Sequence, residues 1–234
     1  MKRHFSETKP EMMDQPDADP EILEDDLRNL RIINRCFGGL SALRNAVVPI
    51  AMRAEPGKTI SILDLATGSG DQPVSIVKTF RRLGKGVRIT AVDRNEIMLN
   101  AARGHASGFP EIQFERGDIL NLQYGRESFD IVSCSLAIHH LSRSNGVKLL
   151  HEMNRICRLG FVVNDLSRSY IGAAVAWVYT RLTTTNPMTR YDSVASVLRA
   201  FRKEELAEMA VEAGVQPVRI FTAPLFRLVV VKEK

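Results

Sequence analysis

Cysteine is scarce in this 234-residue chain, and its three cysteines do not form pairs. Cys36, Cys134 and Cys157 lie far apart and show no C-x-x-C spacing, which disfavours a disulfide framework or a zinc site. A long apolar segment is also missing, since the longest run, residues 170–179, is too short to span a bilayer. The first twenty residues lack the apolar stretch of a secretory signal. We therefore expect a reduced, cytoplasmic protein with no stable membrane insertion.

Neither sign of charge is in strong excess. The formal net charge is +5, and the 32 Lys and Arg residues are interspersed with 27 Asp and Glu residues. A nucleic-acid partner would favour a dense basic face or an appended binding module, and the sequence shows neither. With 44% hydrophobic and 25% charged residues, the composition is that of a globular domain. We predict no nucleic-acid partner.

The rest of the chain is organised around residues 60–70 (ISILDLATGSG). A short apolar run leads into a loop with Gly68 and Gly70, and an amphipathic segment follows, which predicts a buried strand, a tight turn and a helix. Glycines let the backbone approach a ligand there, and the helix N-terminus offers it free N–H groups. The next strand ends at Asp93, 23 positions after Gly70, where a carboxylate can accept hydrogen bonds from a ribose diol. These features predict a nucleoside cofactor.

The loop lacks the third glycine of the dinucleotide fingerprint. That glycine would stand three positions after Gly70, where this chain has Pro73. Proline also removes one of the N–H groups that a pyrophosphate needs at a helix start. The sequence thus disfavours NAD and an NAD-dependent reductase, and favours a cofactor that has a nucleoside but no phosphate.

Strand-like and helical patterns alternate along most of the chain. The expected strands are short apolar runs at residues 59–65, 87–92, 112–115, 128–136 and 160–163. Such alternation implies an α/β fold with a parallel sheet, helices on both faces and all strand carboxyl ends at one edge, where ligands bind. Two final runs, residues 218–222 and 226–231, are joined by a short connection that suits an antiparallel pair.

The flanking segments complete the predicted domain organisation. Residues 1–19 show no periodicity and predict a flexible tail. Residues 20–58 predict two helices that form an N-terminal helical lid over the cofactor edge. Residues 59–234 then form the cofactor-binding catalytic domain. Within that domain, an apolar helix at 170–182 and an irregular stretch at 187–201 suggest a substrate-lid insertion over about residues 167–201.

Four segments resemble class I S-adenosylmethionine-dependent methyltransferases: LDLATGSGD (63–71), AVD (91–93), RGDILNL (116–122) and FDIVSCSLAIHHL (129–141). Three more are similar to a subgroup akin to quinone-biosynthesis methyltransferases and small methyltransferases of polyketide-type pathways: INRCFGGLSALR (33–44), VVNDLSRS (162–169) and DSVASVLRAFRKEEL (192–206). The resemblance implies an enzyme that uses S-adenosyl-L-methionine. It also implies a Rossmann-like, mostly parallel seven-stranded sheet with an antiparallel C-terminal strand.

The resemblance also implies roles for individual residues. Asp93 would hold the ribose hydroxyls, and Asp118 would bond the adenine amino group. Arg44 or Arg35 would pair with the methionine carboxylate. The other implied cofactor-binding residues are Ala66, Thr67, Gly68 and Gly70 in the loop, Arg94, Met98 and Ile119 around the adenine, and Ser135 and Leu136 beneath the sulfonium.

Two adjacent histidines are the candidates for catalysis. The sulfonium is already activated, so catalysis is mainly alignment and exclusion of water. A neutral phenol or enol nucleophile also needs a base, however, and histidine titrates near neutral pH. His139 and His140 follow the predicted 128–136 strand and would act there. A packing or capping role is the alternative for each.

Candidate substrate contacts lie further along the chain. Asp165 follows the predicted 160–163 strand and is expected to orient a substrate hydroxyl, while Arg190 and Arg199 would contact an anionic or hydroxylated acceptor. A hard cation prefers oxygen ligands, and the exit of the 128–136 strand offers two histidines and no acid. We therefore predict no metal requirement.

The favoured function is transfer of a methyl group to a small-molecule acceptor, at a hydroxyl of an aromatic or polyketide-like compound. Two alternatives stay open: C-methylation of a quinone-like acceptor, and a catalytically silent S-adenosylmethionine-binding partner of another subunit. An RNA or protein methyltransferase is disfavoured because the chain has no dense basic face. The sequence leaves the acceptor, the methylated atom and the oligomeric state open.

Overall fold

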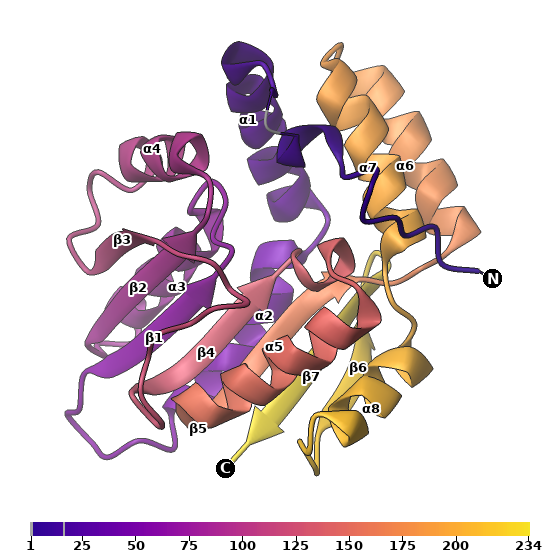
Figure 1. The fold of residues 1–234 in the computed structure, drawn as a ribbon. Coiled ribbons are helices and arrows are strands. Elements are labelled where there is room, and N and C mark those ends of the chain that lie inside the picture. Colours follow the sequence, from indigo (N-terminus) through magenta and orange to yellow (C-terminus); the bar gives the residue numbers. More distant parts are fainter. Residues whose placement is uncertain (1, 16) are drawn as a thin grey trace.

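The computed structural model describes residues 2–15 and 17–234. Its centre is a seven-stranded sheet in the order β3-β2-β1-β4-β5-β7-β6 (Figure 1). The first five strands run parallel, whereas β7 is antiparallel to both β5 and β6. The strands are β1 (Ile60–Leu65), β2 (Val87–Asp93), β3 (Ile112–Arg116), β4 (Phe129–Ser135), β5 (Cys157–Leu166), β6 (Arg219–Ala223) and β7 (Arg227–Glu233). The predicted fold class, including the antiparallel final strand, is confirmed.

Helices cover both faces of this sheet. The helices of the described chain are α1 (Pro20–Cys36), α2 (Gly39–Ala51), α3 (Asp71–Arg82), α4 (Glu96–His105), α5 (Arg143–Ile156), α6 (Tyr170–Thr183), α7 (Pro187–Arg199) and α8 (Lys203–Glu212). Successive strand residues point to opposite faces, so Ile62 joins one core with α2 and α3, whereas Leu63 joins the other with α5 and α8. No helix in the described ranges is both long and apolar enough to cross a membrane.

The region predicted as a two-helix lid divides into two different parts. α1 stands beyond the carboxyl edge of the sheet, near α6 and α7 (Figure 1). α2 instead lies on the sheet, where Leu43, Val47 and Ile50 are completely buried in the same core as Ile62. The apolar stripe of α2 therefore makes it a core helix, and only α1 is placed to cover the cofactor edge.

The stretch at 187–201, predicted to be irregular, contains a regular helix. α7 begins at Pro187, and the side chain of Asn186 caps it by accepting a hydrogen bond from the Thr189 N–H (3.0 Å). Asparagine at the N-cap followed by proline in the first turn is a helix-start signal. The Asn-Pro pair thus starts α7 as well as following the end of α6.

The N-terminal segment also differs from the flexible tail predicted over residues 1–19. Residues 1 and 16 lie outside the described ranges. In the rest, the short 3-10 turn η1 (Met12–Asp14) packs on α7, where Asp192 accepts hydrogen bonds from the N–H groups of Met12 (2.8 Å) and Met13 (2.9 Å). Glu11, just before this turn, is completely buried. Asp192, which anchors the segment, lies about 180 residues further along the chain. The local sequence of the segment therefore does not indicate that it is anchored.

The pairing of β5 with β7 gives a test of the fold. A Cβ added at Gly160 would lie 2.2 Å from the backbone oxygen of Lys232. Because that contact is with backbone, we expect Gly160→Ala to lower the free energy of unfolding by about 3 kcal/mol, at the upper end of overpacking effects. Gly104→Ala is the control, because its Cβ would meet nothing within 4 Å. Urea unfolding of both variants measures the difference, and a wild-type midpoint for Gly160→Ala would contradict the expectation.

Candidate functional site

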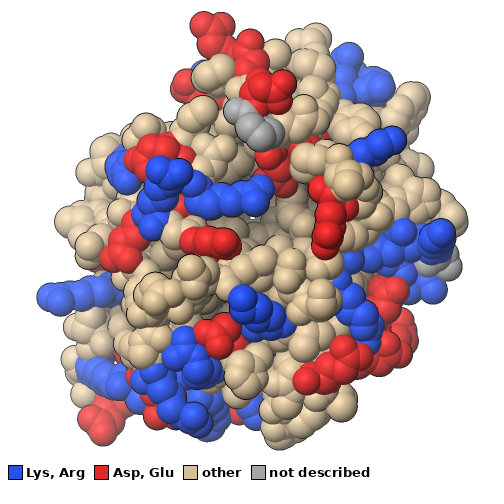
Figure 2. Space-filling model, in the orientation of Figure 1, with Lys and Arg blue, Asp and Glu red and all other residues tan. Residues whose placement is uncertain are grey.

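A cavity of about 480 Å³ opens at the carboxyl edge of the sheet. Strand exits and the glycine loop line one side, and α1, α6, α7 and the N-terminal segment line the other. On the face shown in Figure 2, basic and acidic side chains are interspersed over the surface. The walls from α1 and α6 are largely apolar, and Phe37 and Tyr179 meet there edge to face with ring centroids 4.7 Å apart. The cavity thus has the size and mixed lining of a small-molecule site.

The glycine loop is held tightly against the end of β2. The Thr67 N–H donates to the carbonyl oxygen of Val92 (3.0 Å), and the Gly68 N–H donates to Asp93 Oδ2 (2.9 Å). The other Asp93 oxygen accepts from the Asn95 N–H (3.0 Å). Gly68 has a φ of +52°, which favours glycine, and a Cβ there would point into open space. Asp93 therefore shapes the loop and also borders the cavity.

Most of the predicted cofactor residues line this cavity. They are Ala66, Thr67, Gly68, Asp93, Arg94, Met98, Asp118, Ile119, Ser135 and Leu136. Gly70 lies behind the loop, where it precedes α3 and packs against Ala102. Arg44 sits on the core helix α2, and neither it nor the exposed Arg35 lines the cavity. The structure therefore does not bring Arg44, Arg35 or Gly70 to the cavity wall.

The sequence-based interpretation overlooked two buried acids beside the loop. Asp64, at the end of β1, accepts a hydrogen bond from Ser133 Oγ (2.7 Å), and burial raises the pKa of Asp64 to about 7. Asp71, at the start of α3, accepts a hydrogen bond from Asn34 Nδ2 on α1 (2.9 Å), and burial raises its pKa too. Both line the cavity. The quoted LDLATGSGD motif contains both acids, so their burial at a strand end could have been expected.

His139 is oriented by the neighbouring strand exit. It lies in the short turn η2 (Ile138–His140) after β4, is 2% exposed, and lines the cavity. Its Nδ1 donates to Asp165 Oδ1 (2.6 Å), and its backbone N–H donates to Asp165 Oδ2 (3.1 Å). Although burial acts to raise the pKa of Asp165, the interactions with His139 leave it lowered. Asp165 itself does not line the cavity. Its two hydrogen bonds hold the His139 ring so that Nε2 faces Glu11.

His140 has a second carboxylate partner. Its Nδ1 forms an ion pair with Asp14 Oδ2 (2.6 Å), and Arg94 Nη2 lies 2.8 Å from Asp14 Oδ1. Burial acts to lower the pKa of His140, but Glu11 and Asp14 outweigh it and raise that pKa to about 9. Burial likewise acts to raise the pKa of Asp14, but His140 and Arg94 lower it to about 2. The positive form of His140 and the negative form of Asp14 therefore stabilise each other.

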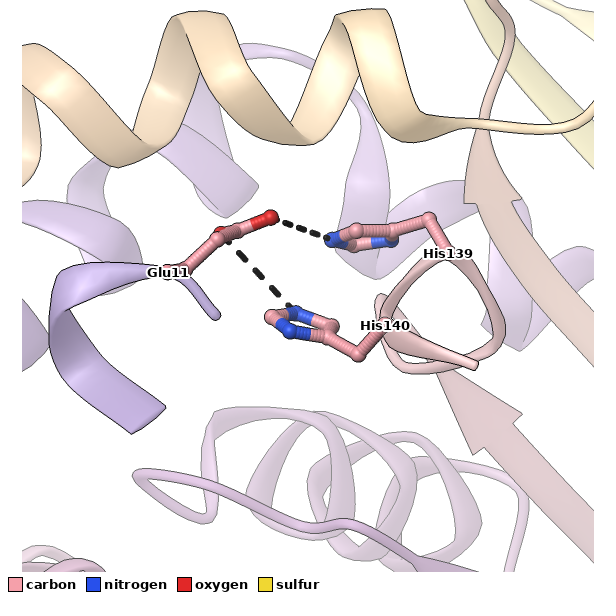
Figure 3. Close-up of side chains that lie close together, drawn as sticks. All are labelled: Glu11, His139 and His140. Carbon is pink, nitrogen blue, oxygen red and sulfur yellow. Dashed lines mark ion pairs between the residues drawn. The ribbon is translucent and has the colours of Figure 1, made fainter. Parts of the chain in front are cut away.

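Glu11 faces both histidines from the N-terminal segment (Figure 3). Its Oε1 lies 3.9 Å from His139 Nε2, and its Oε2 lies 4.0 Å from His140 Nε2. Ser196 Oγ on α7 donates to Glu11 Oε2 (2.6 Å), and Arg199 Nη1 lies 3.6 Å from Oε1. The sequence offered no signal for Glu11, because it lies in the segment that the pattern predicted to be a tail.

The predicted substrate arginines take different positions. Arg199 is buried, lines the cavity and compensates the charge of Glu11. Arg190 is outside the cavity, where its Nε donates to the carbonyl oxygen of Thr184 (2.7 Å) and ties α7 to the preceding connection. The structure thus brings Arg199 to the cavity, whereas Arg190 stabilises the connection between α6 and α7.

Comparison with known proteins gives a match to a methyltransferase domain family over residues 62–160. The ubiquinone/menaquinone biosynthesis C-methyltransferase UbiE of Bdellovibrio bacteriovorus is 40% identical over 101 residues, which is 42% of this chain and 40% of the relative. A demethylmenaquinone methyltransferase of Lactobacillus johnsonii is 30% identical over 99 residues, 41% of this chain and 38% of the relative. The matches thus span about two-fifths of these curated relatives.

Solved structures extend the likeness to the whole fold. A SAM-dependent methyltransferase from Aquifex aeolicus superposes with a TM-score of 0.60 at 17% identity, covering 92% of this chain and 97% of that one. The CurJ carbon methyltransferase gives a TM-score of 0.66 at 11% identity, covering 92% and 61%. Residues 62–160, which hold the parallel half of the sheet, therefore match a methyltransferase domain family, and the whole chain shares its fold with these S-adenosylmethionine-dependent methyltransferases.

Proposed function

We propose that this chain transfers the methyl group of S-adenosylmethionine to a hydroxyl of a small aromatic or polyketide-like acceptor. The observation that carries the proposal is a single cavity that joins two unlike ends. Asp93 and the glycine loop form one end, and the histidine pair forms the other. A cofactor held at the first end would present its methyl group toward an acceptor at the second.

The cofactor end suits a cationic nucleoside. Asp93 and Asp118 offer carboxylates for the ribose and the adenine, as the family resemblance implies. Asp64 and Asp71 add two buried acids near the loop, where the sulfonium and ammonium charges of S-adenosylmethionine would be favourable.

The acceptor end combines apolar walls with one polar corner. Phe37 and Tyr179 can contact an aromatic ring, and His139 and His140 offer the polar groups that an acceptor oxygen needs. Attack on the methyl group is faster from an oxyanion than from a neutral hydroxyl. A free imidazole nitrogen, or a cation held by it, can stabilise that oxyanion.

C-methylation of a quinol-like ring is the second candidate. It is favoured by the names of the relatives, which include C-methyltransferases of quinone biosynthesis. Both reactions start from a phenolate and differ in the atom that attacks. Proton NMR of the product separates them, because a methyl group on oxygen resonates well downfield of one on a ring carbon.

Cofactor binding gives the first test. Asp93→Ala removes the acceptor of two backbone hydrogen bonds that shape the loop. Hydrogen bonds to charged groups contribute about 1.5–3 kcal/mol, so we expect S-adenosylhomocysteine to bind at least about tenfold more weakly. Glu55→Ala, at an exposed position remote from the cavity, is the control. Isothermal titration calorimetry measures both, and equal affinities would refute a cofactor role for Asp93.

Turnover gives the second test. With a panel of small hydroxylated aromatics, we expect His139→Ala to lower kcat about 100-fold at saturating cofactor, in line with the loss of one catalytic group. Its affinity for S-adenosylhomocysteine should stay within about threefold of wild type, because His139 lies at the acceptor end. His105→Ala, at an exposed position of α4, is the control. A wild-type rate for His139→Ala would remove the histidine from the mechanism, and binding without turnover on any acceptor would favour the silent-partner alternative.

A further inference from the structure

Three ligating groups converge at the acceptor end of the cavity. Glu11, His139 and His140 each offer one atom, and these atoms lie within 4.8 Å of one another (Figure 3). Glu11 comes from the N-terminal segment and the histidines come from the exit of β4, so only the folded chain assembles the group. Two ligands of one metal, each about 2.1 Å from it, lie at most about 4.2 Å apart. The separations of 3.9 Å from Glu11 Oε1 to His139 Nε2 and of 4.0 Å from Glu11 Oε2 to His140 Nε2 are within that limit.

The surroundings of the histidines are those of metal ligands. Each imidazole has Nδ1 against an aspartate, Asp165 for His139 and Asp14 for His140, both at 2.6 Å. Each therefore turns Nε2 toward Glu11. A carboxylate behind a histidine is the arrangement that orients imidazole ligands around metals. Simple charge pairing would not require both rings to present the same atom to the same point.

Two of the converging atoms are also left without partners. Glu11 Oε1 and His139 Nε2 have no hydrogen bond within the described chain, although Glu11 is completely buried and His139 is 2% exposed. Arg199 Nη1, at 3.6 Å from Oε1, is too far for a normal hydrogen bond. Leaving buried polar atoms unpaired is unfavourable. A cation between the two atoms would bond to both.

We propose that Glu11, His139 and His140 bind a divalent first-row transition metal, such as Zn²⁺, at the acceptor end of the cavity. Two imidazoles and one carboxylate suit such a metal better than Mg²⁺, which prefers oxygen ligands. The expectation of no metal requirement rested on the exit of the 128–136 strand, which offers two histidines and no acid. Glu11 supplies that acid, and Ser196 and Asp192 on α7 hold its segment in place.

The metal gives the proposed methyl transfer a way to form its nucleophile, so this step rests on the proposed function. All three ligands line the cavity, and an acceptor oxygen can take an open coordination position. Coordination lowers the pKa of the acceptor hydroxyl, and its proton leaves to water. The oxyanion then forms the new bond to the methyl carbon. The carbon–sulfur bond breaks with its electrons going to sulfur, which leaves neutral S-adenosylhomocysteine.

Metal binding can be measured without any acceptor. The 234-residue chain, without a tag, is stripped with EDTA, dialysed and titrated with Co²⁺, which reports coordination by its visible absorption bands. Zn²⁺ is then added in competition, and elemental analysis gives the stoichiometry. We expect one Co²⁺ per chain, displaced by one Zn²⁺. We expect at least tenfold weaker binding in Glu11→Gln and in His140→Ala, and wild-type binding in the control Glu24→Gln, an exposed position on α1.

The opposite results would overturn the proposal. Fewer than about 0.1 Co²⁺ bound per chain would show that Glu11 and the two histidines form ion pairs and no metal site. Equal Co²⁺ affinity in the wild type and in Glu11→Gln would show the same. Binding of S-adenosylhomocysteine by each stripped variant shows that it is folded, and it tests the cofactor end separately. Metal binding can therefore fail while the proposed function stands. Conversely, a bound metal with no cofactor affinity would refute the proposed function alone.

Discussion

The parallel pairing of the central strands is the constraint on which this site depends. In the register of the sheet, Leu65 pairs with Val92 on one side and with Cys134 on the other, and Cys134 pairs in turn with Val163. These four residues therefore lie side by side across the sheet. Asp93 and Asp165, near the ends of β2 and β5, and the glycine loop and histidine turn after β1 and β4 come together at one edge. A register shift between β4 and β5 would separate His139 from Asp165. A shift between β1 and β2 would separate the loop from Asp93.

The edge that results is rich in buried acid. Asp64, Asp71, Asp93 and Asp165 all lie there with little exposure, and Glu11 and Asp192 join them from outside the sheet. Burying carboxylates is unfavourable unless hydrogen bonds or positive charges compensate for lost solvation. The raised pKa values of Asp64, to about 7, and Asp192, to about 6, show that the compensation is incomplete. Such an edge favours ligands that carry positive charge, which a sulfonium cofactor does.

The acceptor end is assembled from segments far apart in sequence. α7 fixes η1 through Asp192, and η1 in turn brings Glu11 and Asp14 to the histidines that follow β4. Helix α1 closes the adjoining wall, where Asn34 joins Asp71 on α3 and accepts a hydrogen bond from the buried Arg227 (3.1 Å). Movement of the N-terminal segment would therefore change the polar corner of the cavity while leaving the sheet intact.

Local sequence was enough to predict the sheet, the loop and most of the residues that line the cavity beside the loop. These features depend on short-range patterns: apolar runs make buried strands, glycines mark the turn, and a carboxylate ends the next strand. The same patterns placed α2 over the cofactor edge, although its apolar stripe packs on the sheet, and they left α7 irregular. The placement of Arg44 followed from family likeness and that of Arg190 from its charge, and the fold puts both outside the cavity.

The sequence by itself thus determined the fold class and the position of the glycine loop, because each strand and turn carries its own signal. Only the tertiary structure decided the acceptor end. Glu11 and Asp14 have no local pattern that marks them, and they reach His139 and His140 through hydrogen bonds between η1 and Asp192, about 180 residues apart. Hydrogen bonds between polar side chains distant in sequence leave no periodicity, so their partners become apparent only when the chain is folded.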